Sequence, residues 1–253
     1  MTTELLTAQE YEHYDAELRD IPRRFLQSKG EMLHNGRNQI CRFTLSDGKK
    51  IVVKRFKHPD FFHSFWYGFI APNKARRSFD HATELRHRGI DTPHEIACIE
   101  ERHGRWLREA YYVCEYTNEG YLTDFITEQS NFNHEAIESF ARFVALLHEK
   151  GIIHKDLNNG NVTYRLSDGH YHFGLIDLNR MTFYADGKLP SRRECLKNLT
   201  LFCDDTPLFR AFLSAYIAAR HWSADTFDEA LKVKAAHDRH WRRKKAVKRW
   251  LKS

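Results

Sequence analysis

The most constraining feature of the sequence is a short polar segment that follows a helix stop in the middle of the chain. Asp156 and Asn161 lie five residues apart in this segment, shortly after Gly151 ends a helix-like stretch. A strand-like stretch, 171–176, then leads into Asp177. Two carboxylates and an amide are therefore expected to meet at the ends of a hairpin. Phosphoryl transfer uses such a set, with one carboxylate for the attacking hydroxyl and the other two groups for Mg²⁺.

The N-terminal part of the chain reads as an antiparallel meander. Three strands are predicted there, at 31–34, 38–45 and 49–56, and turn residues separate them. A helix is expected over 74–88, because the pattern stops at Gly89, a typical residue after a helix end. This order predicts a small sheet accompanied by one main helix.

The pattern becomes mainly helical after a further predicted strand at 110–116. Apolar residues over 134–150 recur at the spacing of an amphipathic helix, and Asn133 is a suitable N-cap. Ser191 and Thr206 carry start signals of two later helices. Strands followed by helices predict an α+β protein in two lobes.

Three segments resemble protein-kinase motifs in the same order along the chain. The stretch H-K-D-L-N-N-G-N, which begins at His154, resembles the kinase catalytic loop, and L-I-D-L-N around Asp177 resembles the strand end that carries D-F-G. Upstream, I-V-V-K ending at Lys54 resembles the strand whose lysine meets the ATP phosphates. The resemblance implies a two-lobed protein-kinase-like fold with an N-lobe, residues 1–116, and a larger helical C-lobe, residues 117–253.

The resemblance also implies roles for single residues. Asp156 would be the catalytic residue that orients and deprotonates the acceptor hydroxyl, while Asn161 and Asp177 would bind Mg²⁺. ATP would be held by Lys54 and by the backbone of a hinge at Glu115 and Tyr116. His154 would brace the loop through hydrogen bonds.

Several of these assignments leave alternatives open. Asp, Asn and Gly are also ordinary turn residues, so the catalytic segment taken alone fits a plain polar turn. Lys54 shares its strand with other lysines, and only its position in the motif selects it. Asn35 and Gly36 could let backbone amides approach phosphates, but a plain hairpin turn fits equally well because the full glycine-rich spacing is absent.

A kinase also needs an acid on its N-lobe helix to hold the lysine. The corresponding position here is Ser78, which departs from the kinase pattern. Glu84 is the preferred substitute, with Asp80 as a neighbouring alternative. A solvated helix face remains the competing interpretation of both acids.

Longer segments are similar to the bacterial lipopolysaccharide core kinase family, which includes the 3-deoxy-manno-octulosonate (Kdo) and heptose kinases. These segments are GRNQICRF, VVKRFKHPD and NKARRSFDHATELRHRGIDTPHEIACIE, together with HKDLNNGNV. The similarity implies ATP-dependent phosphorylation of a sugar hydroxyl on lipid A-linked core at the cytoplasmic face of the membrane. The rivals are an inactive kinase-like module that binds a nucleotide or partner, and a small-molecule phosphotransferase of the aminoglycoside or choline type.

The basic charge of the chain is concentrated at its C-terminal end. The net charge is +6, but eight Lys and Arg residues and no acid lie between Arg239 and Lys252, which leaves −2 for the rest. Trp241 and Val247 interleave with these cations, as do Trp250 and Leu251. The tail therefore suits an anionic membrane surface, with a solvated helix as the alternative and nucleic acid as a less favoured partner.

Other features bear on the cellular location. The five cysteines show no C-x-x-C pair, which favours reduced thiols in the cytoplasm. The N-terminus lacks the pattern of a secretory signal, and no apolar run approaches the roughly 20 residues that span a bilayer. The aromatic stretch 61–69 is expected to pack in the core or between lobes in preference to dipping into lipid. A cytoplasmic protein, peripheral on the membrane at most, is predicted.

Overall fold

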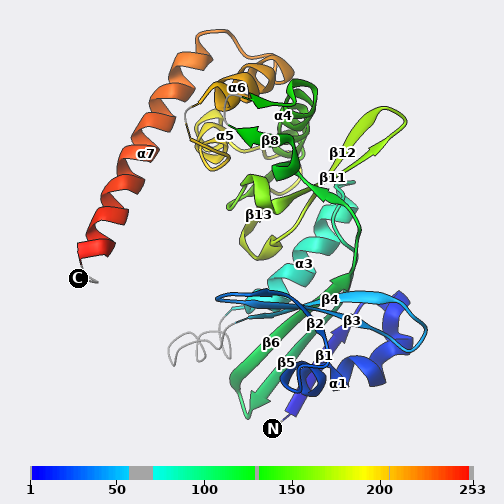
Figure 1. Ribbon diagram of the computed structural model, residues 1–253. Coiled ribbons are helices and arrows are strands. Elements are labelled where there is room, and N and C mark those ends of the chain that lie inside the picture. The colour runs from blue at the N-terminus through cyan, green and yellow to red at the C-terminus, as the bar shows by residue number, and fades with distance from the viewer. Residues whose placement is uncertain (1, 57–70, 129–130, 205, 251–253) are drawn as a thin grey trace. The chain divides into compact units, whose positions relative to one another are not determined.

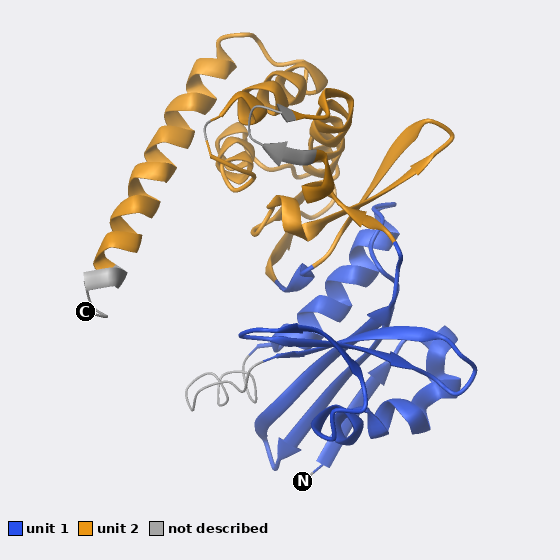
Figure 2. Ribbon diagram, in the orientation of Figure 1, with its two compact units in different colours: residues 1–118, 177–179 blue, residues 119–176, 180–253 orange. Residues whose placement is uncertain are grey.

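The computed structural model divides the chain into two compact units (Figures 1 and 2). The described residues are 2–56, 71–128, 131–204 and 206–250. Unit 1 contains residues 1–118 and 177–179, and unit 2 contains residues 119–176 and 180–253. The aromatic stretch 61–69 lies outside the described residues, so the expectation about it stays a prediction.

Unit 1 is built on a six-stranded antiparallel sheet with the strand order β1-β5-β6-β4-β3-β2. The strands are β1 (Thr2–Thr7), β2 (Glu31–Asn35), β3 (Gln39–Thr44), β4 (Lys50–Phe56), β5 (Glu95–His103) and β6 (Trp106–Glu115). The predicted meander is confirmed as β2, β3 and β4, and the predicted strand at 110–116 is the second half of β6. Sequence reasoning missed β1 and β5.

Each face of this sheet has its own apolar core. Because side chains alternate along a strand, Tyr111 and Val113 of β6 face one cluster while Ala110 and Tyr112 face the other. Helix α1 (Asp15–Leu26) packs on the first face, and helix α3 (Lys74–His87) packs on the second through Ala75 and Phe79.

Helix α1 adds a second helix to the one main helix expected for this part of the chain. Its apolar side chains Leu18, Ile21 and Phe25 recur at helical spacing and are buried in the first core cluster. Pro22 stands inside the helix, where proline normally breaks the pattern. Burial of this apolar stripe therefore outweighs the local proline signal. A 3-10 helix, η1 (Gln9–Tyr14), precedes α1.

Unit 2 is mainly helical. Its helices are α4 (His134–Glu149), α5 (Arg192–Leu199), α6 (Pro207–Ala219) and α7 (Thr226–Trp250). Its short strands are β7 (Gly120–Tyr121), β8 (Ile126–Glu128), β9 (Asn131–Phe132), β10 (Ile152–His154), β11 (Val162–Ser167), β12 (His170–Leu175) and β13 (Met181–Phe183). Three 3-10 helices, η2 (Leu122–Phe125), η3 (Asn159–Asn161) and η4 (Leu178–Arg180), complete the elements, with η4 crossing the unit boundary.

The predicted helix starts of unit 2 are confirmed. The Asn133 side chain accepts a hydrogen bond from the Ala136 amide at the start of α4. Ser191 and Glu194 form a reciprocal capping box on α5, and Thr206 caps α6. None of the helices in the described part of the chain is both long and apolar enough to cross a membrane.

Candidate active site

The predicted catalytic loop lies in unit 2 between β10 and η3. The Asp156 carbonyl oxygen accepts hydrogen bonds from Asn161 Nδ2 at 2.8 Å and from Asn158 Nδ2 at 3.1 Å. The Asn158 side chain also accepts from the Gly160 amide, which starts η3. Two asparagines therefore fix the backbone of Asp156 from the C-terminal side of the loop.

The Asp156 carboxylate itself stays accessible. Its side chain is 42% exposed, and it forms an ion pair with Arg180, whose guanidinium nitrogen lies 4.0 Å from a carboxylate oxygen. A carboxylate at this distance from a mostly exposed arginine keeps its oxygens open to a proton donor. The loop thus holds the backbone firmly and presents the acid, as a general base requires.

His154 links the loop to the end of β12. The Asp156 amide donates to His154 Nδ1 at 3.1 Å, so this nitrogen carries no proton, and His154 Nε2 donates to the Ile176 carbonyl at 3.0 Å. The ring is fully buried. These contacts agree with the bracing role that the kinase resemblance implies.

Asn161 and Asp177 each form side-chain hydrogen bonds through only one of their two polar atoms in the described part of the chain. Asn161 donates through Nδ2 to the Asp156 carbonyl, and Asp177 Oδ1 accepts from Asn179 Nδ2 at 2.6 Å. Asn161 Oδ1 and Asp177 Oδ2 make no hydrogen bond with any described residue. Amide and carboxylate oxygens are ligands that Mg²⁺ prefers, so both residues fit a magnesium site chemically. Asn161 belongs to unit 2 and Asp177 to unit 1.

Lys54 pairs with Asp177 in unit 1. Lys54 Nζ on β4 lies 2.5 Å from Asp177 Oδ1, and the two side chains are 14% and 30% exposed. Asp177 adopts a left-handed backbone with φ of 57°, which non-glycine residues rarely adopt. The structure thus brings together two of the residues that the sequence pattern selects, although 123 positions separate them.

Helix α3 contributes two further groups near Asp177. His81 Nδ1 donates to the Leu178 carbonyl at 2.6 Å and so ties the helix to the segment after Asp177. Burial, followed by the positive charges of Arg37 and Arg77, lowers the pKa of Lys74 in the first helical turn, while Asp177 opposes the shift. Helix α3 therefore presents positive charge in the neighbourhood of Asp177.

The acid expected to hold Lys54 is placed elsewhere. Glu84 pairs with Arg88 at 2.6 Å one turn along the chain, and Asp80 pairs with Arg76 at 2.8 Å. Among the described residues, no ion pair joins either acid to Lys54. Lys54 pairs instead with Asp177. Ser78, at the kinase position, is buried and bonds back to the Lys74 carbonyl.

The expected hinge residues end strand β6. The Glu115 amide donates to the His94 carbonyl and the Tyr116 amide to the Lys50 carbonyl, so both N–H groups are used within the unit. Burial would raise the pKa of Glu115, but hydrogen bonds from Lys49 and Tyr11 outweigh it and lower the pKa. Backbone contacts to adenine at these two residues are thereby limited to carbonyl oxygens.

The turn around Asn35 and Gly36 is a hairpin between β2 and β3. Asn35 pairs with Gln39 across the strands, and the Gln39 side chain donates to Asn35 Oδ1 at 3.1 Å. Gly30 precedes the hairpin, and a Cβ there would lie 2.6 Å from the buried Phe43 ring, so packing explains this glycine.

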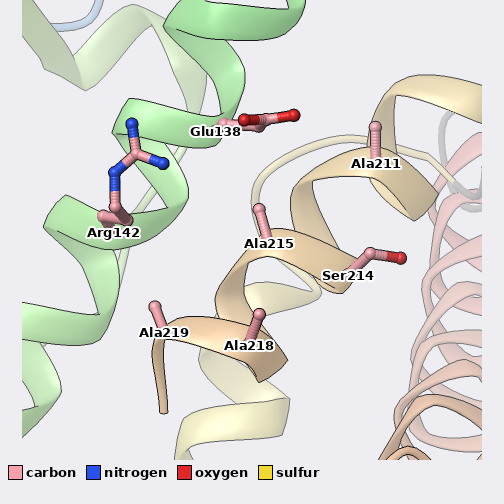
Figure 3. Close-up of a pocket in the computed structure, with 7 residues that line it drawn as sticks. All are labelled: Glu138, Arg142, Ala211, Ser214, Ala215, Ala218 and Ala219. Carbon is pink, nitrogen blue, oxygen red and sulfur yellow. The ribbon is translucent and has the colours of Figure 1, made fainter. Parts of the chain in front are cut away.

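Two further features of the described residues lie apart from this chemistry. No cluster of three or more His, Cys, Asp or Glu residues suited to a metal occurs among them. An open groove between α4 and α6 is lined by Glu138, Arg142, Ser214 and four alanines (Figure 3). None of the predicted site residues lines this groove, so it is not the candidate active site.

Comparisons with known proteins identify the family. The model of the lipopolysaccharide kinase (Kdo/WaaP) family matches residues 28–206, which is well over half of the 253 residues. This chain belongs to that family. The match spans Lys54, the catalytic loop and Asp177, so the candidate site lies within the family region. A search of curated proteins gives no match.

Solved structures agree with a kinase-like fold. The structure described as WaaP in complex with acyl carrier protein has a TM-score of 0.59 and 18% sequence identity, and it covers 98% of this chain and 99% of that chain. The Rio2 kinase in complex with ADP, Mg²⁺ and phosphoaspartate from Chaetomium thermophilum has a TM-score of 0.49 and 13% identity, over 90% of this chain and 76% of that chain. The α+β, protein-kinase-like fold expected from the sequence is confirmed by the first of these matches.

Sequence reasoning missed several residues that contact the site residues. Asn179 follows Asp177 by two positions and could have been found from the polar spacing of L-I-D-L-N. His81 carried no signal, because it reaches Leu178 across 97 residues of sequence. Asn198 donates to the His154 carbonyl from α5, and no local pattern connects the two residues across 44 positions.

Proposed function

We propose that this lipopolysaccharide kinase family member transfers the γ-phosphoryl group of ATP to a hydroxyl of an inner-core sugar, Kdo or heptose. The observation that carries the proposal is the catalytic loop, in which two asparagines and His154 fix the Asp156 backbone while the carboxylate stays accessible. The acceptor on lipid A would place the reaction at the cytoplasmic face of the inner membrane.

Asp156 would accept the proton of the attacking hydroxyl. The sugar oxygen then forms a bond to the γ-phosphorus, the bond from that phosphorus to the bridging oxygen breaks, and ADP leaves with the electron pair. Because such transition states carry spread negative charge, positioning and electrostatic stabilisation dominate the catalysis. The exposed carboxylate supplies the base and the braced backbone supplies its position.

Lys54, Asn161 and Asp177 would serve the nucleotide end of the reaction. Asn161 Oδ1 and Asp177 Oδ2 would hold Mg²⁺, which neutralises phosphate charge when bound. Lys54 would exchange part of its contact with Asp177 for the ATP phosphates, while the carbonyl groups of Glu115 and Tyr116 would receive the adenine amino group. Asn35 and Gly36 would lie near the phosphates only if their hairpin closes over the nucleotide. Glu84 would reach Lys54 only by leaving its ion pair with Arg88.

A direct test is mass spectrometry of envelope glycolipid from cells with and without this chain. The proposal predicts one additional phosphate on the inner core when the chain is present, and the same gain when purified protein, ATP and Mg²⁺ are given the unmodified core. Phosphate on an aminoglycoside or choline with none on the core would favour the small-molecule phosphotransferase. ATP binding without transfer to any acceptor would favour the inactive module.

The C-terminal half of α7 is proposed to bind an anionic membrane surface. Residues 239–247 are all exposed, and this part of α7 extends away from the other helices of unit 2 (Figure 1). The exposed apolar side chains Trp241 and Val247 lie about 120° apart around the helix and share no face. Attraction would therefore be mostly electrostatic, with little insertion into lipid.

Vesicle co-sedimentation tests this part of the proposal. Binding of the full chain to vesicles containing anionic lipid should fall steeply between low and physiological salt, because surface charge is screened within about 8 Å at 0.15 M. Replacement of Arg242, Arg243, Lys244 and Lys245 by Gln should abolish it. Binding that is equal for neutral vesicles would contradict the proposal. The same variant can be assayed with acyl carrier protein, the partner in the WaaP structure.

A further inference from the structure

A continuous chain of buried hydrogen bonds runs from α6 to the catalytic loop. The links are Tyr216 to His148 at 2.7 Å, His148 to Asn198 at 3.0 Å, and Asn198 to the His154 carbonyl at 2.8 Å. His154 in turn accepts from the Asp156 amide at 3.1 Å. Helices α6, α4 and α5 thus contribute one side chain each, and all belong to unit 2.

The donor and the acceptor of each hydrogen bond in this series follow from its last acceptor, the His154 carbonyl. A backbone carbonyl only accepts, so the Asn198 amide must turn Nδ2 toward His154 and Oδ1 toward His148. His148 Nε2 therefore donates to Asn198. His148 Nδ1 is left to accept from the Tyr216 hydroxyl, provided that the ring is neutral.

The surroundings keep the His148 ring neutral. Burial is the main cause that lowers its pKa to about 4, and the positive charge of Arg220 on the neighbouring helix acts in the same direction. The hydrogen bond to Asn198 opposes this shift without overcoming it. At neutral pH the chain of hydrogen bonds thus has one consistent arrangement, which a low-dielectric interior strengthens.

Burial gives this arrangement its stiffness. His148, His154 and Tyr216 are fully buried, and Asn198 is 4% exposed. Removal of one member would leave a buried donor or acceptor unpaired, so the remaining groups would shift to recover a partner. The backbone that would shift is the carbonyl of His154, two residues before Asp156.

We propose that Tyr216, His148 and Asn198 form a positioning relay that sets the backbone of the catalytic loop, and through it the place of the Asp156 carboxylate. This inference rests on the proposed function, because it assigns Asp156 the role of base. Small misplacements of a catalytic group cost up to about a hundredfold in rate even when the changed residue touches no substrate. The three residues are therefore positioning residues and make no contact with the reacting atoms.

The test compares relay variants with a matched control. Tyr216→Phe and Asn198→Ala remove the first and the last side-chain link, and Tyr111→Phe removes the hydroxyl of another fully buried tyrosine, which donates to Glu101 in unit 1. All are assayed for kcat and for the KM of ATP at a temperature where circular dichroism shows them folded. Asn198→Ala should lower kcat about 10- to 100-fold and Tyr216→Phe about threefold, with the KM of ATP within twofold. Tyr111→Phe should leave kcat unchanged.

A second readout is independent of activity. Hydrogen exchange of the peptide covering 152–158 should speed up in Asn198→Ala and Tyr216→Phe and stay unchanged in Tyr111→Phe, because the backbone around His154 would be held less firmly by the relay. Folded relay variants with wild-type kcat and wild-type exchange would overturn the relay. If wild-type protein phosphorylates no acceptor, the proposed function fails, and the exchange result alone decides the relay. Where Asn198→Ala does not fold, His148→Leu takes its place, because it removes the donor to Asn198, and the same changes in kcat and exchange are expected.

Discussion

In unit 1 the predicted lysine is held by an ion pair near the surface, whereas in unit 2 the predicted loop is held by neutral hydrogen bonds in the interior. Lys54 contacts Asp177 with both side chains partly exposed, while His154 and Asn198 are buried and uncharged in their contacts. Ion pairs near the surface rearrange readily, and buried neutral networks do not. This difference suits the proposed roles, because Lys54 and Asp177 would have to exchange partners when the nucleotide binds, whereas Asp156 would have to stay in place.

The largest effect should come from breaking the ion pair of unit 1. Asp177→Asn removes the carboxylate that pairs with Lys54 and would bind Mg²⁺, so kcat should fall about 10²- to 10³-fold. The fall should be accompanied by a higher Mg²⁺ requirement in steady-state assays. Asp80→Asn on α3 is the matched control, because the ion pair that Asp80 forms among the described residues is with the exposed Arg76. Equal activity of the two variants would contradict the role given to Asp177.

The buried hydrogen-bond network of unit 2 should make the stability of the protein depend on pH in the acidic range. The pKa of His148 is about 4 when folded, against about 6.5 for an ordinary histidine. Below pH 6.5, His148 binds a proton in the unfolded chain but stays neutral in the folded chain. The free energy of unfolding therefore decreases as pH falls from about 6.5 toward 4. The loss is on the order of 3 kcal/mol over that window.

The measurement is urea unfolding at pH 7 and pH 4.5 for wild type and His148→Gln. The variant should be less stable at pH 7 and should lose less stability on acidification. Burial raises the pKa of Tyr216 on α6 and of Cys195 on α5, which face this site, so neither group should titrate in this window. An identical acid dependence in the two proteins would show that His148 is not the group responsible.

The smallest effect should come from Glu84. Its pair with Arg88 is a partly buried i, i+4 contact, and helix pairs at this spacing are worth about 0.3–0.5 kcal/mol. Glu84→Gln should therefore change thermal stability slightly and leave kcat and the KM of ATP unchanged. A tenfold or larger loss of activity would instead support the role that kinase patterns give to this acid, which is to hold Lys54.

Local sequence predicted what lies close together in the chain. The catalytic loop could be predicted because Asp156, Asn158 and Asn161 bond within a few residues of one another. Helix caps such as Ser191 were predictable for the same reason. Pairings such as Lys54 with Asp177 needed a family pattern, since no local propensity connects them.

The rest could not be predicted because it depends on tertiary packing. Helix α1 carries Pro22 and many charges, so only the sheet that it covers reveals its buried stripe. His148 reads as one more residue near the end of an amphipathic helix. Its partners lie on α5 and α6, at sequence separations of 50 and 68.

The central claim is that Asp156 is the base of a phosphoryl transfer and not a structural turn residue. Asp156→Asn tests it most directly, because the carboxylate is exposed and its backbone bonds, which hold the loop, remain. Single-turnover transfer from ATP to inner-core glycolipid should fall at least about 10²-fold, while ATP binding and hydrogen exchange of the loop match wild type. Transfer at the wild-type rate in this variant would contradict the account.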